Sequence, residues 1–403
     1  MLKAIGGGIT APKGFKAAGV KAGIKKSGKE DVAVIYSTAP ASAAALFTTN
    51  TFAAAGVLVS RPVAAKGTAQ AIVVNSGCAN SCTGEQGLAD ARAMAHHTAS
   101  LLGLADDDVF VASTGIIGVN LPMAKVADGI KRAVAALSVD GHEKALQGIM
   151  TTDTFPKVSA YEFSLGGTIA RVAGIAKGAG MISPNMATLL SFVTTDAAIA
   201  PAALKQALKE AVDVSMNSIT VDGDMSTNDT LCLLANGQAG NKLIEGAGDP
   251  AYAEFVTALT AVCTDLAKLI VRDGEGATKF LEITVRGATS YADAKTAAMS
   301  VAKSPLVKTA FFGQDPNWGR ILCAAGYSGA KIDPDKATLA LGGIVVARNG
   351  MNAAVANAGA LQKVMAGKDI VVELDLGVGG AAATVWTCDF SYEYVKINAD
   401  YST

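Results

Sequence analysis

The sequence alternates β-rich runs with amphipathic helical stretches, and this order limits the possible folds more than any other feature. Three runs rich in β-branched residues end in turn residues and are predicted strands, at residues 31–37, 71–75 and 108–114. Residues 84–103 and 121–137 carry apolar residues at helical spacing and are predicted helices. Strands that alternate with helices in this way are typical of an α/β fold.

The same order continues in the second half of the chain. An apolar stripe from Leu204 to Met216 follows Pro201 at helical spacing, so a helix is expected to begin at this proline. In residues 280–287 apolar and polar residues alternate, as they do in a half-buried strand. The remaining predicted elements are a strand at 188–197, a helix at 252–272, and two strands at 371–380 and 383–397 joined by a glycine-rich hairpin turn.

Composition bounds the class of partner. The 403 residues are enough for two domains or one large one, and 50% of them are hydrophobic while 17% are charged. The formal net charge of -1 argues against nucleic acid or an anionic membrane as the main partner, which leaves a small molecule. Since the chain has no apolar run long enough for a bilayer and no signal-like start, we expect a cytoplasmic protein.

Several familiar chemistries need residues that this sequence does not supply in the right pattern. The histidines are His96, His97 and His142, too few and too far from Cys78 and Cys82 for a zinc ligand set, so no metal is predicted. The same scarcity disfavours a Ser-His-Asp triad. The six cysteines lack CxxC spacing, and most are expected to be small buried hydrophobes. No phosphate-binding glycine motif is present, and no cofactor is predicted.

The segment "KGAGMISPNMATLLSFV", residues 177–193, suggests a different nucleophile. A threonine hydroxyl needs an adjacent base, and the α-amine of the same residue becomes one when the preceding peptide bond is cut. Gly178, Gly180 and Pro184 suit a strained turn that would present the Ala187 carbonyl to the Thr188 hydroxyl. The hypothesis is therefore self-cleavage between Ala187 and Thr188. An ordinary loop before a strand is the simpler alternative.

Eight further blocks accompany this segment in the order found in one family, so the resemblance covers nearly the whole chain. The segment itself resembles the signature of the ornithine acetyltransferase (ArgJ) family, whose members are also called bifunctional glutamate N-acetyltransferases. The other blocks are "TAPKGFKAAGVKAGIKKSGKEDVAVI", "NSGCANSCTGEQG", "STGIIG", "MTTDTFPK", "SITVDGDMSTNDT", "VRDGEGATK", "FFGQDPNWGRI" and "YVKINADYST".

The resemblance implies an acetyltransferase of arginine biosynthesis. After self-cleavage, Thr188 would take acetyl from N2-acetyl-L-ornithine as an ester and pass it to L-glutamate in a ping-pong reaction. The family contains members that also use acetyl-CoA as donor, and the sequence leaves open whether this chain does. It also leaves open whether the chain is cleaved.

The resemblance further implies a chain organisation and a fold. The α chain would be residues 1–187 and the β chain residues 188–403, and the two would stay together as one α/β unit with a smaller second lobe. The expected fold is the two-domain ArgJ/DmpA-like architecture, in which mixed sheets lie between helices in αββα order. The expected assembly is a heterotetramer of two α and two β chains.

Site residues are carried over from the family pattern one by one. Thr114 and Gly115 match the oxyanion-hole pair, and their place after a predicted strand agrees with this role. Lys177, eleven residues before Thr188, would meet a substrate carboxylate, and Glu275 suits the amine of ornithine. The remaining matched substrate-binding positions are Asn398, Thr403, and one of Thr152 and Thr154, between which the sequence does not decide.

The polar block at 218–230 resembles no complete metal loop, because the EF-hand spacing with its closing glutamate is absent. Asp222 and Asn228 in this block are predicted to support the site structurally.

Two other functions stay in view. One is an N-terminal-nucleophile amidohydrolase or aminopeptidase of the same fold, in which water takes the acyl group; a site that excludes water would favour transfer instead. The other is an uncleaved, non-catalytic binding protein, which the presence of Thr188, Lys177 and the oxyanion pair disfavours.

Overall fold

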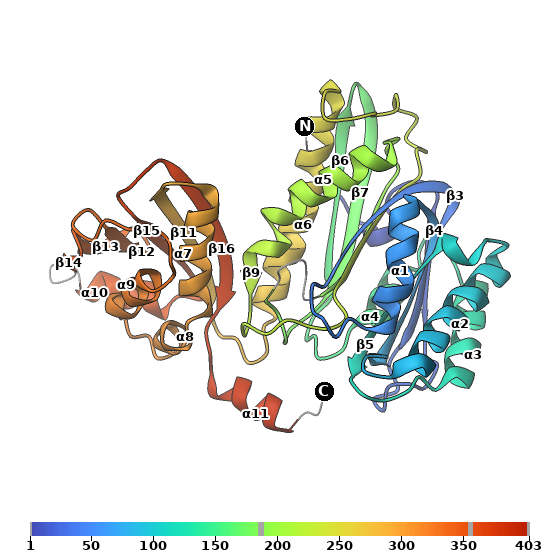
Figure 1. Ribbon diagram of the computed structural model, residues 1–403, viewed down its shortest axis with the longest axis horizontal. Helices are drawn as coiled ribbons and strands as arrows, with labels where there is room; N and C mark the ends of the chain where they lie inside the picture. Colours follow the sequence, from blue (N-terminus) through green and yellow to red (C-terminus); the bar gives the residue numbers. More distant parts are fainter. Residues whose placement is uncertain (1, 184–188, 354–357, 401–403) are drawn as a thin grey trace.

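The computed structural model describes residues 2–183, 189–353 and 358–400. They form a larger lobe and a smaller one, each built on a mixed β-sheet (Figure 1). Among these residues, none of the helices has both the length and the apolar character needed to cross a membrane.

The larger lobe contains a nine-stranded sheet with the order β1-β6-β7-β8-β10-β3-β4-β5, in which β2 pairs with β3. The pairs β4–β5 and β8–β10 are parallel and the others are antiparallel, so the sheet is mixed. Its strands are β1 (Leu2–Ala4), β2 (Phe15–Val20), β3 (Val32–Phe47), β4 (Thr68–Cys78), β5 (Val109–Ile116), β6 (Lys157–Leu165), β7 (Thr168–Lys177), β8 (Leu190–Thr195) and β10 (Thr230–Ala235).

Six α-helices and three short 3-10 helices, η1 to η3, accompany this sheet. Pro201 and Pro250 each occupy the first turn of a helix, where the missing proline N–H costs no hydrogen bond. The helices are α1 (Ala55–Lys66), α2 (Gly84–Leu102), α3 (Met123–Ala135), α4 (His142–Ile149), α5 (Pro201–Asp213), α6 (Pro250–Arg272), η1 (Gly8–Thr10), η2 (Asp106–Asp108) and η3 (Met216–Ser218).

The long strand β3 shows how the layers arise. Its residues Ile35 and Ala43 point to an inner core that β7, β8 and β10 also share, whereas Val34 and Leu46 point to the outer helices. Because successive side chains of a strand face opposite sides, one strand serves both cores. From one side of Figure 1 to the other the layers are α5 and α6, then β6 and β7, then β3 and β4, then α2 and α3. This is the expected αββα order.

The smaller lobe is built on a seven-stranded sheet of order β14-β13-β12-β15-β11-β16-β9. Its buried apolar side chains form a separate core. Its elements are β9 (Ile219–Thr220), β11 (Phe280–Ala288), α7 (Tyr291–Lys303), α8 (Pro305–Phe312), α9 (Trp318–Gly326), β12 (Thr338–Leu341), β13 (Ile344–Arg348), β14 (Met351–Asn352), α10 (Ala358–Ala366), β15 (Asp369–Asp375), β16 (Ala381–Cys388) and α11 (Tyr392–Asp400).

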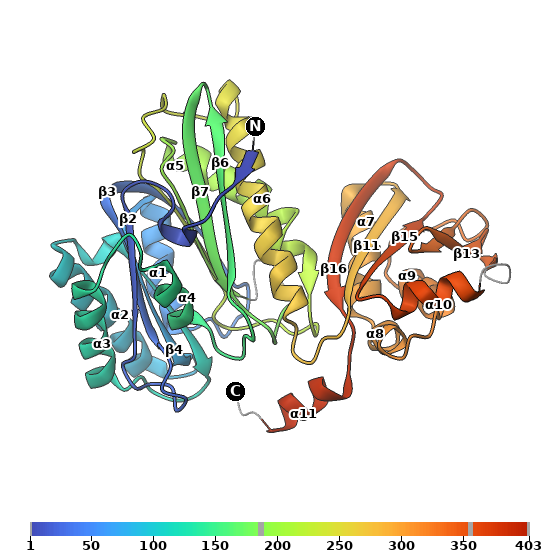
Figure 2. The same ribbon diagram turned by 180° about the vertical axis from the view of Figure 1, so that it is seen from behind.

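Two connections join the lobes. β9 lies in the sequence between α5 and β10 of the larger lobe, yet it pairs in parallel with Trp386 and Thr387 of β16. At the other end of the chain, α11 leaves the smaller lobe and runs back beneath the larger one (Figure 2). α11 has no buried residue, so its position depends on a few polar and aromatic contacts rather than on a core.

The predicted strands and helices of the first half are all present, with β3 longer than its predicted range. In the second half, β8, α5, α6 and β11 match the predictions, although α5 ends before Met216, which lies in η3 and is still buried in the same core. Four of the six cysteines are buried, as expected. β6, β7 and α1 lie outside the predicted elements.

The predicted hairpin near the C-terminus is wrong. β11 lies between β15 and β16, pairing in parallel with the first and antiparallel with the second, so the glycine-rich link crosses over β11 instead of making a tight turn. Residues 392–400 are helical, not extended. The hairpin error arises because alternation shows which residues face a core but not which strand lies alongside.

Candidate active site

One cavity, about 140 Å³ in volume, lies where loops of the larger lobe meet the end of α11. It gathers residues from seven separate stretches of sequence. Most predicted site residues are among those that line it: Thr114, Gly115, Ile117, Thr151, Thr152, Lys177, Gly180, Met181, Leu189, Leu190, Asp222, Asp224, Ser226, Asn228, Asp229, Glu275, Tyr394 and Asn398.

Thr114 and Gly115 lie at the end of β5, opposite Ser76 and Gly77 of β4. Gly115 has a φ of 132°, and a Cβ added to it would lie 2.3 Å from the carbonyl carbon of Gly77. Only glycine fits such a position. The Thr114 hydroxyl accepts a hydrogen bond of 3.2 Å from Lys177 Nζ. The predicted oxyanion pair therefore lies beside the predicted cation.

Lys177 is the last residue of β7 and pairs with Leu190 of β8. Removal of its ammonium group from water lowers the pKa of Lys177, and the negative charge of Asp153 offsets part of that shift. A cation held with so little water favours an anionic partner. A carboxylate of a substrate is such a partner.

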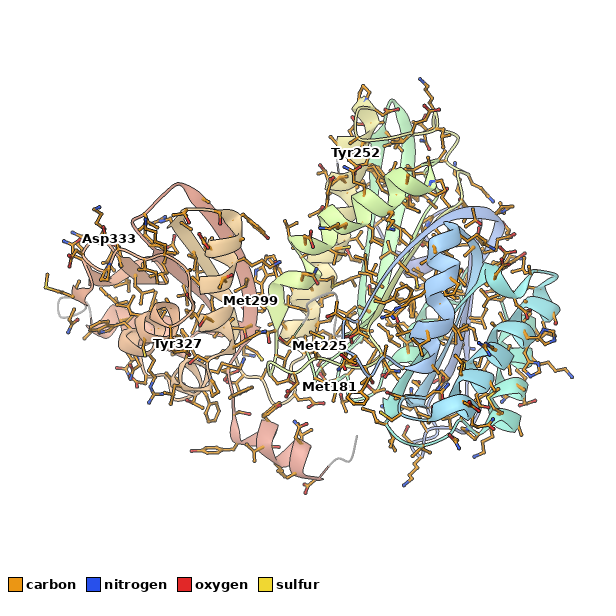
Figure 3. The ribbon with its side chains drawn as sticks, in the orientation of Figure 1. Met181, Met225, Tyr252, Met299, Tyr327 and Asp333 are labelled. Atoms are coloured by element: carbon orange, nitrogen blue, oxygen red, sulfur yellow. The ribbon has the colours of Figure 1, made fainter. Side chains whose placement is uncertain are left out.

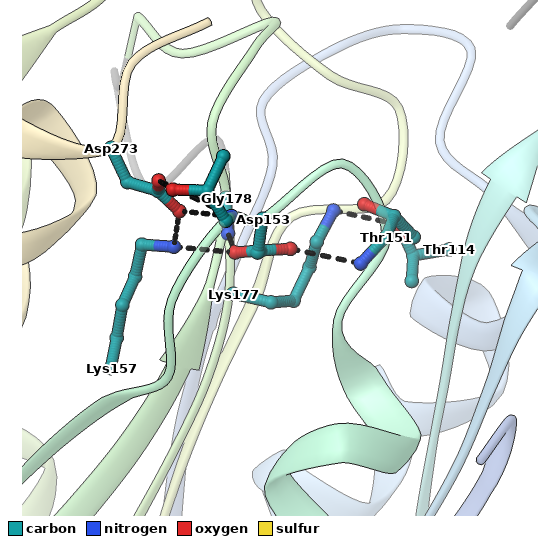
Figure 4. A network of polar contacts seen from close by, with 8 residues as sticks. Thr114, Thr151, Asp153, Lys157, Lys177, Gly178 and Asp273 are labelled. Carbon is teal, nitrogen blue, oxygen red and sulfur yellow. Dashed lines mark hydrogen bonds and ion pairs between the residues drawn. The ribbon is translucent and has the colours of Figure 1, made fainter. Parts of the chain in front are cut away.

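A buried ionic network holds residues 151–157 against Gly178, the residue after this lysine (Figure 4). Asp153 accepts hydrogen bonds from Lys157 Nζ at 2.6 Å, from Gly178 N at 2.8 Å and from Thr151 N at 2.8 Å. Lys157 Nζ also donates to Asp273 at 2.5 Å, and its side chain is 0% exposed. The network fixes the residues next to Thr152 and Lys177. The sequence prediction did not include it.

The structure separates the two candidate threonines. Thr152 lines the cavity. Thr154 does not line it; its hydroxyl and its N–H both donate to Asp273. Geometry therefore favours Thr152 for substrate contact and gives Thr154 a structural contact.

Glu275 and Asn398 meet across the cavity although they are far apart in sequence. Asn398 Nδ2 donates to Glu275 Oε2 at 2.9 Å. The Glu275 N–H donates to the Ala179 carbonyl at 2.9 Å, and a Cβ on Gly180 would lie 2.4 Å from Glu275 Oε2. The glycine at 180 thus leaves room for this carboxylate.

Asp222 and Asn228 hold the walls in place. Asp222 accepts hydrogen bonds from Met181 N at 2.6 Å and from Ile182 N at 2.9 Å, in a turn where Met181 has a φ of 56°. In Figure 3 this methionine lies at the lower edge of the larger lobe, near Met225. Asn228 Nδ2 donates to the carbonyls of Ala79, at 2.6 Å, and Ser113, at 2.8 Å. These contacts agree with the predicted supporting roles.

Asp229 lines the same cavity but did not figure in the sequence prediction. It is 1% exposed, and within the described part of the chain its Oδ2 has no hydrogen-bond partner. Burial raises the pKa of the Asp229 carboxyl well above its ordinary value, and the charge of Lys177 only partly opposes this. The one sequence signal for Asp229 is its position directly before the apolar run 230–235, which places a carboxylate at the start of a buried strand.

Ala187, Thr188 and Thr403 lie outside the described residues. The proposed nucleophile and cleavage site therefore stay predictions. Leu189, the sequence neighbour of Thr188, lines the cavity. Residues 2–183, 189–353 and 358–400 contain no group of three or more His, Cys, Asp or Glu side chains placed to hold a metal ion.

The model of the ArgJ family matches residues 16–403. The chain belongs to the ArgJ family. One ArgJ relative, the "arginine biosynthesis bifunctional protein ArgJ" of Geobacter sulfurreducens, is 52% identical over 395 residues, which are 97% of this chain and 99% of that protein. A protein of the same name from Symbiobacterium thermophilum is 52% identical over 401 residues, 99% of each chain.

Solved structures of ArgJ proteins are also similar to parts of the chain. Ornithine acetyltransferase from Mycobacterium tuberculosis, determined in complex with ornithine, is 41% identical and aligns over 46% of this chain and 100% of that chain, with a TM-score of 0.44. An ArgJ protein from Bacillus halodurans is 38% identical and covers 46% of this chain and 98% of that chain, also with a TM-score of 0.44.

Proposed function

We propose that this chain is an acetyltransferase of arginine biosynthesis that moves acetyl from N2-acetyl-L-ornithine to L-glutamate. Membership of the ArgJ family and the printed name of the relatives that are 52% identical over nearly their whole length support this. The observation that carries the proposal is the cavity itself. It combines an oxyanion pair, a cation, an anion and the residue that follows Thr188.

Each wall suits one part of an acetylated diamino acid. The Thr114 hydroxyl and the Gly115 N–H would stabilise the oxyanion that forms when the acetyl carbonyl is attacked. The Lys177 ammonium would bind the substrate carboxylate, and Glu275 would bind the amine at the far end of ornithine. Thr152 and Asn398 would add neutral hydrogen bonds.

Within this proposal the chain cleaves itself between Ala187 and Thr188. Thr188 then carries the acetyl group as an ester, with its own α-amine as base. The unperturbed α-amine has a pKa of about 7.7–8.0, so a useful fraction is unprotonated at neutral pH. Residues 1–187 would form the α chain and 188–403 the β chain.

The proposal also covers the second acetyl donor, the assembly of the α and β chains, and the cellular compartment. The word "bifunctional" in the names of the relatives supports acetyl-CoA as a second acetyl donor, used as a substrate, with no other cofactor. Family resemblance supports a heterotetramer of two α and two β chains. All six cysteines are free thiols, which suits the reducing cytoplasm.

Intact mass under denaturing conditions tests the cleavage step. Wild-type protein should give two fragments, residues 1–187 and residues 188–403. A Thr188→Ala variant should give one full-length chain. A single uncut wild-type chain with full activity would contradict the mechanism.

Acetyl transfer is tested with N-acetylornithine in the presence and absence of glutamate. We expect N-acetylglutamate to form and little acetate to be released without an acceptor. Rapid acetate release that glutamate does not change would instead indicate the amidohydrolase. The same assay with acetyl-CoA in place of N-acetylornithine decides whether the chain has the second donor activity.

A further inference from the structure

The wall of the cavity includes a buried carboxylate, Asp229, that the protein compensates only in part. The charge of Lys177 and hydrogen bonds from Ser226, Thr48 and the Leu189 backbone do not outweigh its burial. Asp229 is 1% exposed and its Oδ2 has no hydrogen-bond partner among the residues that the structure describes. A buried polar atom without a partner costs free energy, so it is rare in a folded protein. Because Asp229 is one of the residues that line the cavity, a bound substrate can supply the partner that this oxygen lacks.

The other carboxylates on the cavity wall differ from Asp229. Asp222 accepts three backbone N–H groups, and Glu275 accepts a hydrogen bond from Asn398. Asp224 is exposed to water. Asp153, behind the wall, is paired with Lys157. Asp229 is therefore the wall carboxylate that is both buried and short of a partner.

Hydrogen bonds hold the residues on either side of Asp229 in place. Asn228 donates to the carbonyl of Ser113, the residue before Thr114. Thr230 N donates to the Leu189 carbonyl at 3.0 Å. The carboxylate thus lies between the oxyanion pair and the strand that Thr188 precedes. Glu275, in contrast, contacts Asn398 of α11 on the other wall.

We propose that Asp229 is a catalytic residue that binds the reacting α-amine of the substrate and exchanges a proton with it. This inference rests on the proposed function. The ligand class is an α-ammonium group, supplied by the glutamate that enters and by the ornithine that leaves. Glu275 still binds the other amine of ornithine, at the end of its side chain.

The proton balance closes over one cycle. In the first half, the Thr188 hydroxyl proton passes through its α-amine to the nitrogen of the amide as the C–N bond breaks. Protonated Asp229 then gives the free ornithine amine its last proton. In the second half, the Asp229 carboxylate takes one proton from the glutamate ammonium group. The freed lone pair attacks the acetyl ester, the C–O bond breaks, and the second amine proton returns to Thr188.

The raised pKa of Asp229 agrees with such an exchange, because a carboxyl of ordinary acidity would hold the proton too weakly. Lys177 is the cation that most opposes this shift. Its 3.2 Å hydrogen bond to Thr114 directs its ammonium group toward the oxyanion pair.

The test compares two acetyl acceptors in the Asp229→Asn variant. Glutamate enters as an ammonium ion and must lose a proton, whereas hydroxylamine is neutral near neutral pH. In ping-pong kinetics, kcat/KM for an acceptor reports the half-reaction with that acceptor. We expect D229N to lose at least about 100-fold in kcat/KM for glutamate. We expect kcat/KM for hydroxylamine to change little.

An equal loss with both acceptors, or no loss with either, would overturn the proposal. Asp90→Asn is the matched control, because Asp90 is another buried aspartate, bonded to Gln86 outside the cavity. It should leave both rates unchanged. If the wild type transfers acetyl to neither acceptor, the proposed function fails, and that result is separate from any effect of Asp229.

A measurement on the wild type covers the case in which D229N fails to fold or to mature. Ornithine and 5-aminopentanoate differ only in the α-amine. As inhibitors competing with N-acetylornithine, they should differ in Ki by about tenfold or more in favour of ornithine, the value of a charge-assisted hydrogen bond. Equal inhibition would show that the cavity has no site for an α-ammonium group, and would overturn the proposal.

Discussion

Lys157 and Asp229 are both buried ionic groups near one cavity, and the protein treats them in opposite ways. Lys157 is 0% exposed and donates to two carboxylates, Asp153 and Asp273. Asp229 is 1% exposed and has an oxygen with no partner in the described chain. A compensated buried charge holds structure together, whereas an uncompensated one costs stability and is kept for another reason.

Removing the compensating cation should have the largest effect. Lys157→Met leaves two buried carboxylates without their partner, so we expect the free energy of unfolding to fall by about 3–5 kcal/mol. Denaturant unfolding measures it. The control is Lys66→Met, which removes an exposed pair with Asp107 and Asp108 and should cost at most about 1 kcal/mol. Equal losses in the two variants would break the comparison.

The second test concerns the Thr114 hydroxyl, which lines the cavity and accepts a hydrogen bond from Lys177. Thr114→Val keeps the shape of the side chain and removes its donor, so we expect kcat for acetyl transfer to fall by about 100- to 1000-fold. Thermal unfolding should change little, since within residues 2–183, 189–353 and 358–400 the hydroxyl hydrogen-bonds only to the Lys177 ammonium. A normal kcat would show that Thr114 is a turn residue only.

Variants of Thr152 and Thr154 compare a residue that lines the cavity with one that has a structural contact. Thr154→Val removes a hydroxyl that donates to Asp273, and should lower the free energy of unfolding by about 1.5–3 kcal/mol. Thr152→Val should leave unfolding unchanged and raise KM for N-acetylornithine. Denaturant unfolding and steady-state kinetics on both variants measure these effects. The reverse assignment of effects would contradict the geometry.

Glu275→Gln tests the carboxylate that already has a partner. We expect KM for N-acetylornithine to rise about tenfold, the value of about 1.4 kcal/mol, with kcat nearly unchanged. The reason is that Glu275 would bind an amine that takes no part in the reaction. Steady-state kinetics decide between this and a loss in kcat, which would place Glu275 at the reacting centre.

Asp229→Asn should have the smallest effect on stability at neutral pH, or the opposite sign. Because the pKa of the Asp229 carboxyl is raised in the folded state, the folded protein binds this proton more tightly than the unfolded chain does. The wild type therefore loses stability relative to the variant as pH rises through that pKa. Unfolding measured from acid to neutral pH checks this. A constant gap would mean that the carboxylate has a structural partner.

Much of the fold could be predicted from local pattern. The helical spacing in 121–137 and the alternation in 280–287 both correspond to observed elements, α3 and β11. Strand order could not be predicted in this way. β11 separates β15 from β16. β9 lies in the sequence between two elements of the larger lobe but pairs within the smaller lobe's sheet, because pairing depends on contacts between residues far apart in sequence.

The candidate site divides in the same way. Family motifs indicated Thr114, Gly115 and Lys177, and the structure places all three on one wall. The choice between Thr152 and Thr154 required the position of Asp273, more than a hundred residues away. Asp229 lies within the family block at 218–230, but the block did not single it out, because the lack of a hydrogen-bond partner is a property of the folded chain.

The sequence by itself determined the α/β class, the family and the kinds of residue available for chemistry, since these follow from periodicity and from ordered motifs. Only the tertiary structure decided which charges are compensated. Burial turns Lys157 into a support and leaves Asp229 with an open oxygen. The physical reason is that the cost of a charge depends on its surroundings, and residues distant in sequence supply those surroundings.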